Sequence, residues 1–567
     1  MQSTPATLEE ILARHEWIST FTHSLDVAFL LRTNDAPSPL QSAGLKASLE
    51  SVKTARAELQ SDLDLLHNAT AVLQSQMSRL QSFEDGYKAA LSPIRRIPPE
   101  ITMEILRRSR ENENMGSCYP GRHVFGFNVF TVQEGPWHLG QVCRSWRNVI
   151  ETFCPELWAA VAVDIPLRLM LGASLKADAL VEMLRVVLER SRNHPLDFYL
   201  ELYDAEAGAL QTKVMERCFH ILVAHSNRWR AIEIVVPPVL LPQLSLIRGK
   251  TECLRDIYIY CSCADPQSGD IHAFEIAPKL EKLYFKGLPP EANIHFPVDN
   301  LVSFSDERPF AGDRWTPKYL DIIRSAPKLR SFSYNDYGID PISTPFSAPD
   351  VMSRSVEELS ASSPSFMRSL VLPSLKGFTL TTGCDIFRTG HELIKCPVDA
   401  LSALHKMLVQ SQCFLTRLHL IDVVLNDDLA NIIRLVPGLQ DFVIKFHEWE
   451  DEYDPIMVSL VRQLSEMNLI DGSLQHTMVP SLQELGIYLY SLHYTRVSFL
   501  DSAFVDMVAS RVRCRSDARR LVRLDLLVRG FRWSYELNEV ALNNLRGEGL
   551  ELHFSRFDGD PGIDSDE

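Results

Sequence analysis

The stretch that decides the fold begins Leu415-Thr-Arg-Leu-His-Leu, and a second copy of its pattern, Leu439-Gln-Asp-Phe-Val-Ile, starts 24 residues later. In both copies the apolar residues alternate with period two, which predicts a short strand with one buried face. Between them, Leu429-Ala-Asn-Ile-Ile carries apolar residues at helical spacing. A strand, a turn and a helix that recur at short intervals predict a stack of repeats whose parallel strands share one face.

Copies of this pattern, Leu-x-x-φ-x-φ with φ apolar, run through residues 164–556. The region resembles leucine-rich repeats, which implies an α/β solenoid. Spacings between copies reach 46 residues (Leu329 to Leu375) against the usual ~20–29, and the Asn or Cys that normally follows the strand is missing. We therefore expect an irregular solenoid with inserted loops such as Gly338–Ser369, with an ordinary α/β sheet as the alternative. The copies begin at Trp229, Leu254, Leu280, Leu301, Leu329, Leu375, Leu415, Leu439, Leu482 and Leu521.

Residues 44–91 follow a heptad pattern, after a short flexible or helical segment at 1–43. Eleven of fourteen seam positions between Leu45 and Leu91 are apolar, which predicts one long helix with a coiled-coil stripe. Periodicity does not identify what covers the stripe, so a homodimer through this helix and packing within the same chain both remain open. The apolar seam positions are Leu45, Leu49, Val52, Leu59, Leu63, Leu66, Leu73, Met77, Leu80, Tyr87 and Leu91.

The segment after this helix predicts a pair of short helices. Ile97-Pro-Pro-Glu-Ile has prolines where a helix begins, since their missing N–H groups cost nothing in a first turn. A second apolar stripe at helical spacing predicts another helix over Trp137–Phe153, and Pro155-Glu-Leu-Trp closes the unit. Two such short helices cannot bury all their Ile, Leu and Trp among themselves, so some of this surface should meet a partner or the next domain.

These motifs resemble the F-box of F-box-like proteins abundant in fungi. The resemblance implies a small all-α domain at 92–163 that docks on a Skp1-like adaptor of a cullin-RING ubiquitin ligase. Here the two helices are separated by an unusually long insertion at 110–136, which leaves them able to pair because closure entropy grows only slowly with loop length. The positions carried over as docking and core residues are Ile97, Pro98, Pro99, Ile101, Ile105, Leu139, Val142, Cys143, Trp146, Leu157 and Trp158.

The composition describes a large, acidic chain of 567 residues with a net charge of −16. That balance gives no reason to coat nucleic acid or an anionic membrane, and no apolar run approaches the ~18 residues of a membrane span. The N-terminus lacks the basic and apolar regions of a signal peptide, and eleven cysteines have no regular spacing. We expect an intracellular protein, cytoplasmic, nuclear or both, with an acidic disordered tail at 557–567.

Motifs for catalysis, phosphate binding or metal binding are missing from the sequence. The histidines have no obvious carboxylate partner along the chain. We therefore expect no enzyme activity, no cofactor and no metal. Two charged clusters stand out: the acidic, aromatic stretch His447–Asp454, which could hold a basic segment, and the arginines of Arg511–Arg523, which could hold an acidic or phosphorylated one. For both clusters we favour the plainer interpretation of a solvated loop or a polar helix face.

The sequence is compatible with three functions. The first is a non-catalytic ligase adaptor, in which the F-box docks Skp1 within a cullin complex and the repeats bind an unidentified target protein. The second is an interaction scaffold outside any ligase, dimerised through the heptad helix. The third is an unrecognised hydrolase in the repeat region, which would need convergent titratable groups with perturbed pKa values. The adaptor is favoured because it alone explains all three segments together.

Overall fold

The chain forms two compact units, Met1–Ile101 and Thr102–Glu567, in a computed structural model. The boundary between the units falls inside the helix α4 (Pro99–Glu113). The structure describes residues 7–33, 36–113, 126–164, 177–202, 209–261, 269–308, 312–336, 350–383, 394–470, 473–490, 497–514, 520–528 and 536–555.

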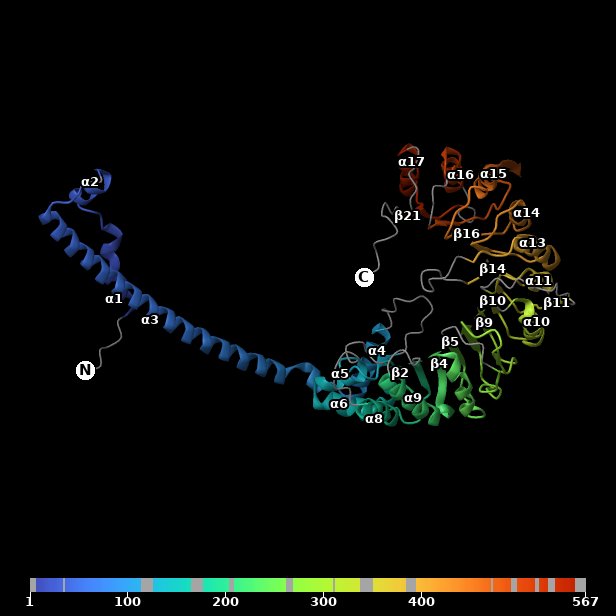
Figure 1. Ribbon diagram of the computed structural model, residues 1–567, viewed down its shortest axis with the longest axis horizontal. Coiled ribbons are helices and arrows are strands. Elements are labelled where there is room, and N and C mark those ends of the chain that lie inside the picture. The colour runs from blue at the N-terminus through green and yellow to red at the C-terminus, as the bar shows by residue number, and fades with distance from the viewer. Residues whose placement is uncertain are drawn as a thin grey trace. The chain divides into compact units, whose positions relative to one another are not determined.

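The first unit is dominated by one helix, α3 (Pro39–Leu91), which is 53 residues long (Figure 1). It begins with a capping box, because the Ser38 hydroxyl accepts from the Gln41 amide and the Gln41 side chain returns to the Ser38 amide. The long helix expected at 44–91 is therefore confirmed, with its start at Pro39. Shorter helices precede and follow it: α1 (Leu8–His15), η1 (Glu16–Thr20), α2 (Leu25–Thr33) and η2 (Pro93–Arg96).

The second unit is built on a single sheet of fifteen parallel strands whose spatial order follows the sequence. All ten copies of the Leu-x-x-φ-x-φ pattern form strands in it, which confirms the large parallel α/β fold. The strands are β1 (Phe127–Asn128), β2 (Ala160–Val163), β3 (Leu196–Glu201), β4 (Trp229–Val236), β5 (Asp256–Cys261), β7 (Lys282–Lys286), β9 (Ser303–Arg308), β10 (Ser331–Asp336), β12 (Glu358–Ala361), β14 (Gly377–Leu380), β15 (Arg417–Ile421), β16 (Asp441–Phe446), β19 (Glu484–Leu489), β20 (Arg523–Val528) and β21 (Glu551–Ser555).

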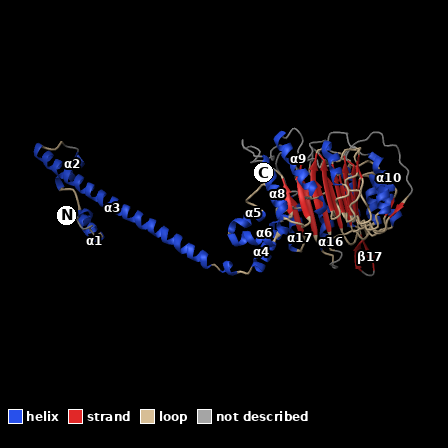
Figure 2. Cartoon of the chain, turned by 90° about the horizontal axis from the view of Figure 1, so that it is seen from below, coloured by secondary structure: helices blue, strands red, loops and turns tan. Residues whose placement is uncertain are grey.

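The sheet of this unit curves, with its strands on the inner side and its helices on the outer side (Figure 1). Figure 2 shows the same strands side by side in one row. We call the inner side the concave face. The outer helices are α8 (Ala177–Arg190), α9 (Ala209–Ala224), α10 (Thr316–Ser325), α11 (Pro364–Arg368), α13 (Ala400–Ser411), α14 (Asp428–Leu435), α15 (Tyr453–Ser465), α16 (Ser502–Val512) and α17 (Glu536–Gly547).

The core lies between the sheet and these helices. In the repeat at β16 the three apolar positions Leu439, Phe442 and Ile444 are all buried, at 0–2% exposure. Successive strands stack in register, so each copy places its apolar residues on those of the next, as Leu418 does on Phe442. Burying each such side chain stabilises the fold by about 1.5–3 kcal/mol, and repetition makes the core continuous.

The expected loop at Gly338–Ser369 is wrong for its described part, residues 350–369. This part contains a further repeat, Val356-Glu-Glu-Leu359-Ser-Ala361, which forms β12 and is followed by α11. Val356, Leu359 and Ala361 are buried at 0–2% exposure, so Val takes the place of the first Leu and Ala that of the last apolar residue. The apparent spacing of 46 residues therefore holds two repeats.

The sheet also starts earlier than the residue 164 expected for the repeat region. Its first strand, β1, lies in the insertion at 110–136, and β2 begins two residues after Trp158. Insertion residues 114–125 and the acidic tail 557–567 lie outside the described residues. Among the helices of the described residues, none is long and apolar enough to cross a membrane.

Candidate interaction surfaces

The helix α4 has one packed and one exposed apolar face. Leu106 is buried at 1% exposure, whereas Ile101 and Ile105, one turn apart, are 54% and 41% exposed. Arg107 Nε donates to Glu156 Oε1 at 2.6 Å, and this hydrogen bond raises the pKa of Arg107. Ile105 is therefore exposed on the part of α4 whose other side is anchored within the second unit, whereas Ile101 is the last residue of the first unit.

The expected helix Trp137–Phe153 is two helices, α5 (Gly135–Val142) and α6 (Arg144–Phe153). Cys143 interrupts it with an extended backbone (φ −160°, ψ 169°), and its Sγ accepts from the Trp146 amide at 3.4 Å. Cys143 thus caps α6 and is exposed, not a core residue as expected. The sequence did not reveal this break, because the apolar residues before and after Cys143 keep nearly the same helical spacing.

The break leaves Val142 57% exposed at the end of α5, while Val149 and Ile150 of α6 are buried. Leu139 and Trp146 are partly buried and pack against the core. Among the remaining positions carried over from the resemblance, Ile97 is half-buried, and Pro98 and Pro99 are exposed. The accessible apolar residues of the helices α4–α6 in the second unit are therefore Ile105, Val142 and, at the end of α6, Phe153.

Leu157 and Trp158, in η3 (Pro155–Trp158), belong to the core of the second unit. The Trp158 ring lies edge-on to Trp137, with centroids 4.9 Å apart. The Arg190 guanidinium from α8 stacks over Trp158 at 4.7 Å and pairs with Glu151 at 2.7 Å. This cluster joins α5 and α6 to η3 and α8, so these two positions are structural.

The heptad seam of α3 is covered unevenly within the first unit. Near its N-terminal half, Asp62 accepts from Arg14 at 3.0 Å and lies 2.9 Å from His15 Nε2, and Ile11 of α1 is buried. Leu45, Leu59 and Leu66 are half-buried, and Leu49, Val52 and Leu63 are 42–52% exposed. In the C-terminal half, Leu73, Met77, Leu80, Tyr87 and Leu91 are 64–71% exposed.

The concave face near β5 and β7 carries a group of tyrosines. The rings of Tyr258 and Tyr260 lie 5.9 and 5.6 Å from that of Tyr284. Burial and the carboxylates of Asp256 and Glu233 raise the pKa of Tyr258 to about 12, so its hydroxyl stays protonated. Strand register then places a band of small hydroxyl residues beside this group. They are Ser303, Ser305, Ser331, Ser333, Ser360 and Thr379.

Towards the C-terminus the concave face carries paired charges instead. His419 Nε2 lies 2.8 Å from Asp441 Oδ2, and His553 Nδ1 lies 2.8 Å from Asp525 Oδ1. Histidines with carboxylate partners were not expected from the sequence, because the partners are on neighbouring strands more than twenty residues away. The concave face therefore changes along the sheet from tyrosines to hydroxyls to ion pairs.

The acidic, aromatic cluster His447–Asp454 is neither an open groove for a basic segment nor a fully solvated loop, the two interpretations that the sequence allowed. Trp449 and Tyr453 are buried at 4% and 2% exposure. His447 is buried too, with Nδ1 2.6 Å from Asp422 Oδ2, and Glu450 pairs with Lys395. The aromatic residues belong to the core, so only exposed acidic side chains of this cluster are accessible to a basic partner.

The arginine cluster is also structural in its described members. Arg511 is fully buried and donates to the carbonyl oxygens of Leu464, Met478 and Val479 at 2.8–2.9 Å. Arg513 pairs with Glu548. Arg520 donates to the Glu548 carbonyl, and Arg523 pairs with Asp525. Arg515 and Arg519 lie outside the described residues.

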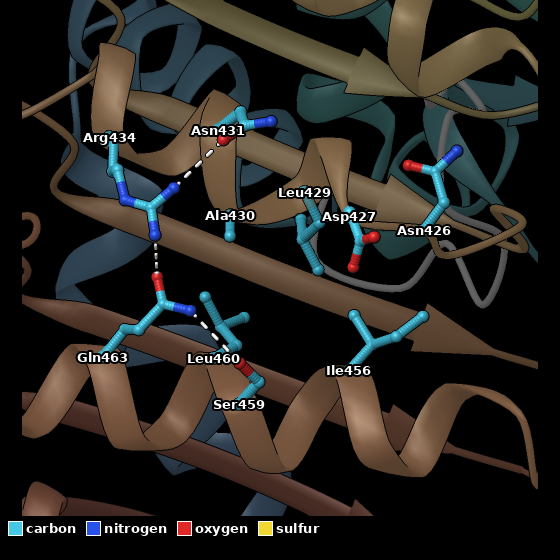
Figure 3. A pocket seen from close by; sticks show the side chains of 10 residues that line it. All are labelled: Asn426, Asp427, Leu429, Ala430, Asn431, Arg434, Ile456, Ser459, Leu460 and Gln463. Carbon is cyan, nitrogen blue, oxygen red and sulfur yellow. Dashed lines mark hydrogen bonds between the residues drawn. The ribbon is translucent and has the colours of Figure 1, made fainter.

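Two pockets lie among the outer helices. One, of about 390 Å³, is lined by Leu408, Phe414 and Pro437 among others, and Phe414 is 85% exposed. The other, of about 210 Å³, lies between α14 and α15. Figure 3 shows that Arg434 of α14 bridges the two helices by donating to Gln463 Oε1 of α15, and that it also donates to Asn431 Oδ1 within α14. Its polar bridge and small volume do not indicate a site for chemistry.

A contact between Ser510 Oγ and His476 Nε2, 3.5 Å apart, is the feature that comes nearest to a nucleophile and base in the described chain. His476 is buried, and burial together with Arg511 lowers its pKa to about 4. A triad would place a carboxylate at His476 Nδ1, and among the described residues no carboxylate pairs with this histidine. The pair therefore gives the hydrolase hypothesis no support.

No family model matches the chain, and no curated protein matches it.

Proposed function

We propose that this chain is the substrate-recognition adaptor of a Skp1–cullin–F-box type ubiquitin ligase. In this proposal the F-box-like helices α4–α6 dock a Skp1-like adaptor, and the leucine-rich-repeat-like solenoid binds the target protein. The chain itself performs no chemistry, since ubiquitin transfer belongs to other subunits.

The observation that carries the proposal is the exposure of Ile105 and Val142. Both belong to the motif that resembles the F-box, and both are on helices of which another face packs against the core of the second unit, through Leu106 of α4 and Leu139 of α5. Large apolar side chains held rigidly at a surface are typical of protein interfaces, because burying them against a partner gains free energy without ordering the chain.

The concave face supports the second half of the proposal. Parallel strands of a solenoid present an extended surface, and tyrosines are prominent among residues that dominate binding energy. Tyr258, Tyr260 and Tyr284 form such a group, and the adjoining serines leave room for a partner's side chains. We place the target protein across this group and the hydroxyl band.

The docking half is tested by capture of purified Skp1 on the full chain and on a variant carrying Ile105→Asp and Val142→Asp. Each buried aspartate should cost about 2 kcal/mol or more, so capture should be lost at concentrations that saturate the native chain. The matched control carries Val398→Asp and Val540→Asp, which are 69% and 56% exposed on other parts of the second unit. Equal capture by both variants would refute the docking surface, provided that circular dichroism shows both folded.

The alternative function, a scaffold dimerised through α3 outside any ligase, is favoured by one observation. The C-terminal half of the seam is 64–71% exposed along a helix with no buried residue. A second copy would cover this stripe by coiled-coil packing. Failure to bind Skp1 together with a dimer in solution would favour the scaffold.

A further inference from the structure

A small two-stranded ladder outside the main sheet brings together side chains that bind metal ions. β6 (Asp270–Ile271) and β8 (Asn293–Ile294) pair in parallel, with Asp270 opposite Asn293. The ladder continues by one hydrogen bond from the His295 amide to the Ile271 carbonyl, at 2.9 Å. Because alternate residues of a strand point the same way, Asp270 and His272 share a face with Asn293 and His295.

The ladder has one buried face and one face open to solvent. Ile271 and Ile294 are buried at 2% and 1% exposure, whereas Asp270 is exposed and both histidines are half-buried. The two strands come from neighbouring repeats, since β7 lies between them in sequence and β5, β7 and β9 are adjacent in the main sheet. The polar face is thus a point where one repeat meets the next.

The three candidate ligand atoms, one each from Asp270, His272 and His295, all lie within 4.8 Å of one another. His295 Nε2 is 3.1 Å from Asp270 Oδ1. The His272 and His295 rings are stacked, with centroids 4.4 Å apart and planes 8° from parallel. Side chains with lone pairs converge here on one small volume.

The side chain of Asn293 also contacts this group. Its amide Nδ2 donates to Asp270 Oδ1 at 2.6 Å and lies 3.2 Å from His295 Nε2. Lys318 fixes the amide orientation, because its Nζ donates to Asn293 Oδ1 at 2.5 Å and to the Ile294 carbonyl at 2.9 Å. The Asn293 amide therefore donates to Asp270, and His295 Nε2 lies within hydrogen-bond distance of both the amide nitrogen and the carboxylate.

The donor set selects the class of metal. Two imidazoles and one carboxylate suit Zn²⁺ and similar transition-metal ions, whereas Ca²⁺ and Mg²⁺ prefer oxygen ligands alone. Glu275 Oε2 lies 3.5 Å from His272 Nδ1 and accepts from Arg248 at 2.6 Å, so it can orient this ring from outside. Lys318 Nζ is held by the amide oxygen of Asn293 and the carbonyl oxygen of Ile294, and not by the candidate ligands.

We propose that Asp270, His272 and His295 bind one Zn²⁺ ion that joins two neighbouring repeats. The fourth position is taken by water. The ion ties β6 to β8 across the repeat junction, and the metal adds stability by binding the folded chain only. This proposal is independent of Skp1 docking.

The test uses the full, untagged chain, stripped with a chelator and titrated with Zn²⁺ by calorimetry and with Co²⁺ by visible absorption. We expect one equivalent to bind, a tetrahedral Co²⁺ spectrum, and a higher melting temperature with zinc. His272→Ala and His295→Ala should each weaken binding roughly 100-fold and remove the thermal shift, because each supplies one of only three protein ligands.

The matched control is His419→Ala, which removes a histidine from a His–Asp pair that lacks a second histidine ligand. It should bind zinc as the native chain does. The proposal is overturned if the native chain takes up no zinc. It is equally overturned if the His272→Ala and His295→Ala variants bind zinc as tightly as the His419→Ala control, which would place the ion elsewhere.

Discussion

Replacing Arg511 and Arg513 by methionine, one at a time, separates a structural arginine from a surface one. Arg511 is buried on α16, and its guanidinium donates to three carbonyl oxygens. Burial lowers the pKa of Arg511 to about 10, which reflects partners that are carbonyls and not carboxylates. Arg513, two residues on, pairs with Glu548 at the surface.

The expected loss of stability in Arg511→Met follows from the three hydrogen bonds that its guanidinium donates. Each hydrogen bond from a charged donor contributes about 1.5–3 kcal/mol when its acceptor would otherwise be left buried and unpaired. Removing the buried charge recovers part of this sum, because the guanidinium no longer has to be desolvated. We therefore expect a net loss of about 3–5 kcal/mol for Arg511→Met, and no measurable loss for Arg513→Met, since an exposed ion pair is screened by water.

Hydrogen exchange read by mass spectrometry is the assay, because a repeat protein opens locally and need not unfold in one step. A loss of 3 kcal/mol should speed exchange of α16 amides by about 100-fold in Arg511→Met and leave them unchanged in Arg513→Met. Similar exchange in both variants would refute the structural role of Arg511. It would also revive the anion-binding surface that the sequence suggested for this cluster.

Three further predictions concern pH, association and the break between α5 and α6. The folded pKa of His476, about 4, lies below its usual 6.5, so the unfolded chain binds the extra proton between these values and stability should fall as the pH drops from 6.5 to 4. A urea titration at pH 7 and pH 5 checks this, and His476→Gln should flatten the dependence. The full chain should sediment as a dimer, and the double variant Leu73→Glu with Leu80→Glu should sediment as a monomer. The control Phe83→Glu, which changes an exposed residue outside the seam, should remain a dimer. If the native chain sediments as a monomer, the seam is not a dimer interface. Cys143→Ala should destabilise α6 by about 0.5–1 kcal/mol through loss of its cap, while Cys143→Ser keeps an acceptor and should be neutral; equal thermal stability of both would contradict the capping role.

The sequence predicted the repeat strands well because their evidence is local. Each copy carries its own period-two pattern, and burial of Leu439, Phe442 and Ile444 needs nothing from distant residues. The repeat at Val356 was missed because Val and Ala stand where the pattern asked for Leu and a large apolar residue. The break at Cys143 was missed because the spacing of apolar residues hardly changes when a helix restarts at once.

Charged and polar residues were predicted less well, because their roles depend on partners far along the chain. The sequence suggests that Arg511 is a surface charge, but in the structure it is buried and donates to the carbonyl oxygens of Leu464, Met478 and Val479. Trp449 and Tyr453 stand among acids in a stretch that the sequence favoured as a solvated loop or a polar helix face, although both lie in the core. Asp270, His272 and His295 carry no spacing signal, since 23 residues separate the two histidines and only the pairing of β6 with β8 unites them.

The central claim, that α4–α6 form a Skp1-docking unit, is tested most directly by calorimetric titration of the intact native chain with purified Skp1. The account predicts one Skp1 per chain with a negative heat-capacity change, because docking buries apolar surface that is now exposed at Ile105 and Val142. The absence of any saturable binding would contradict it.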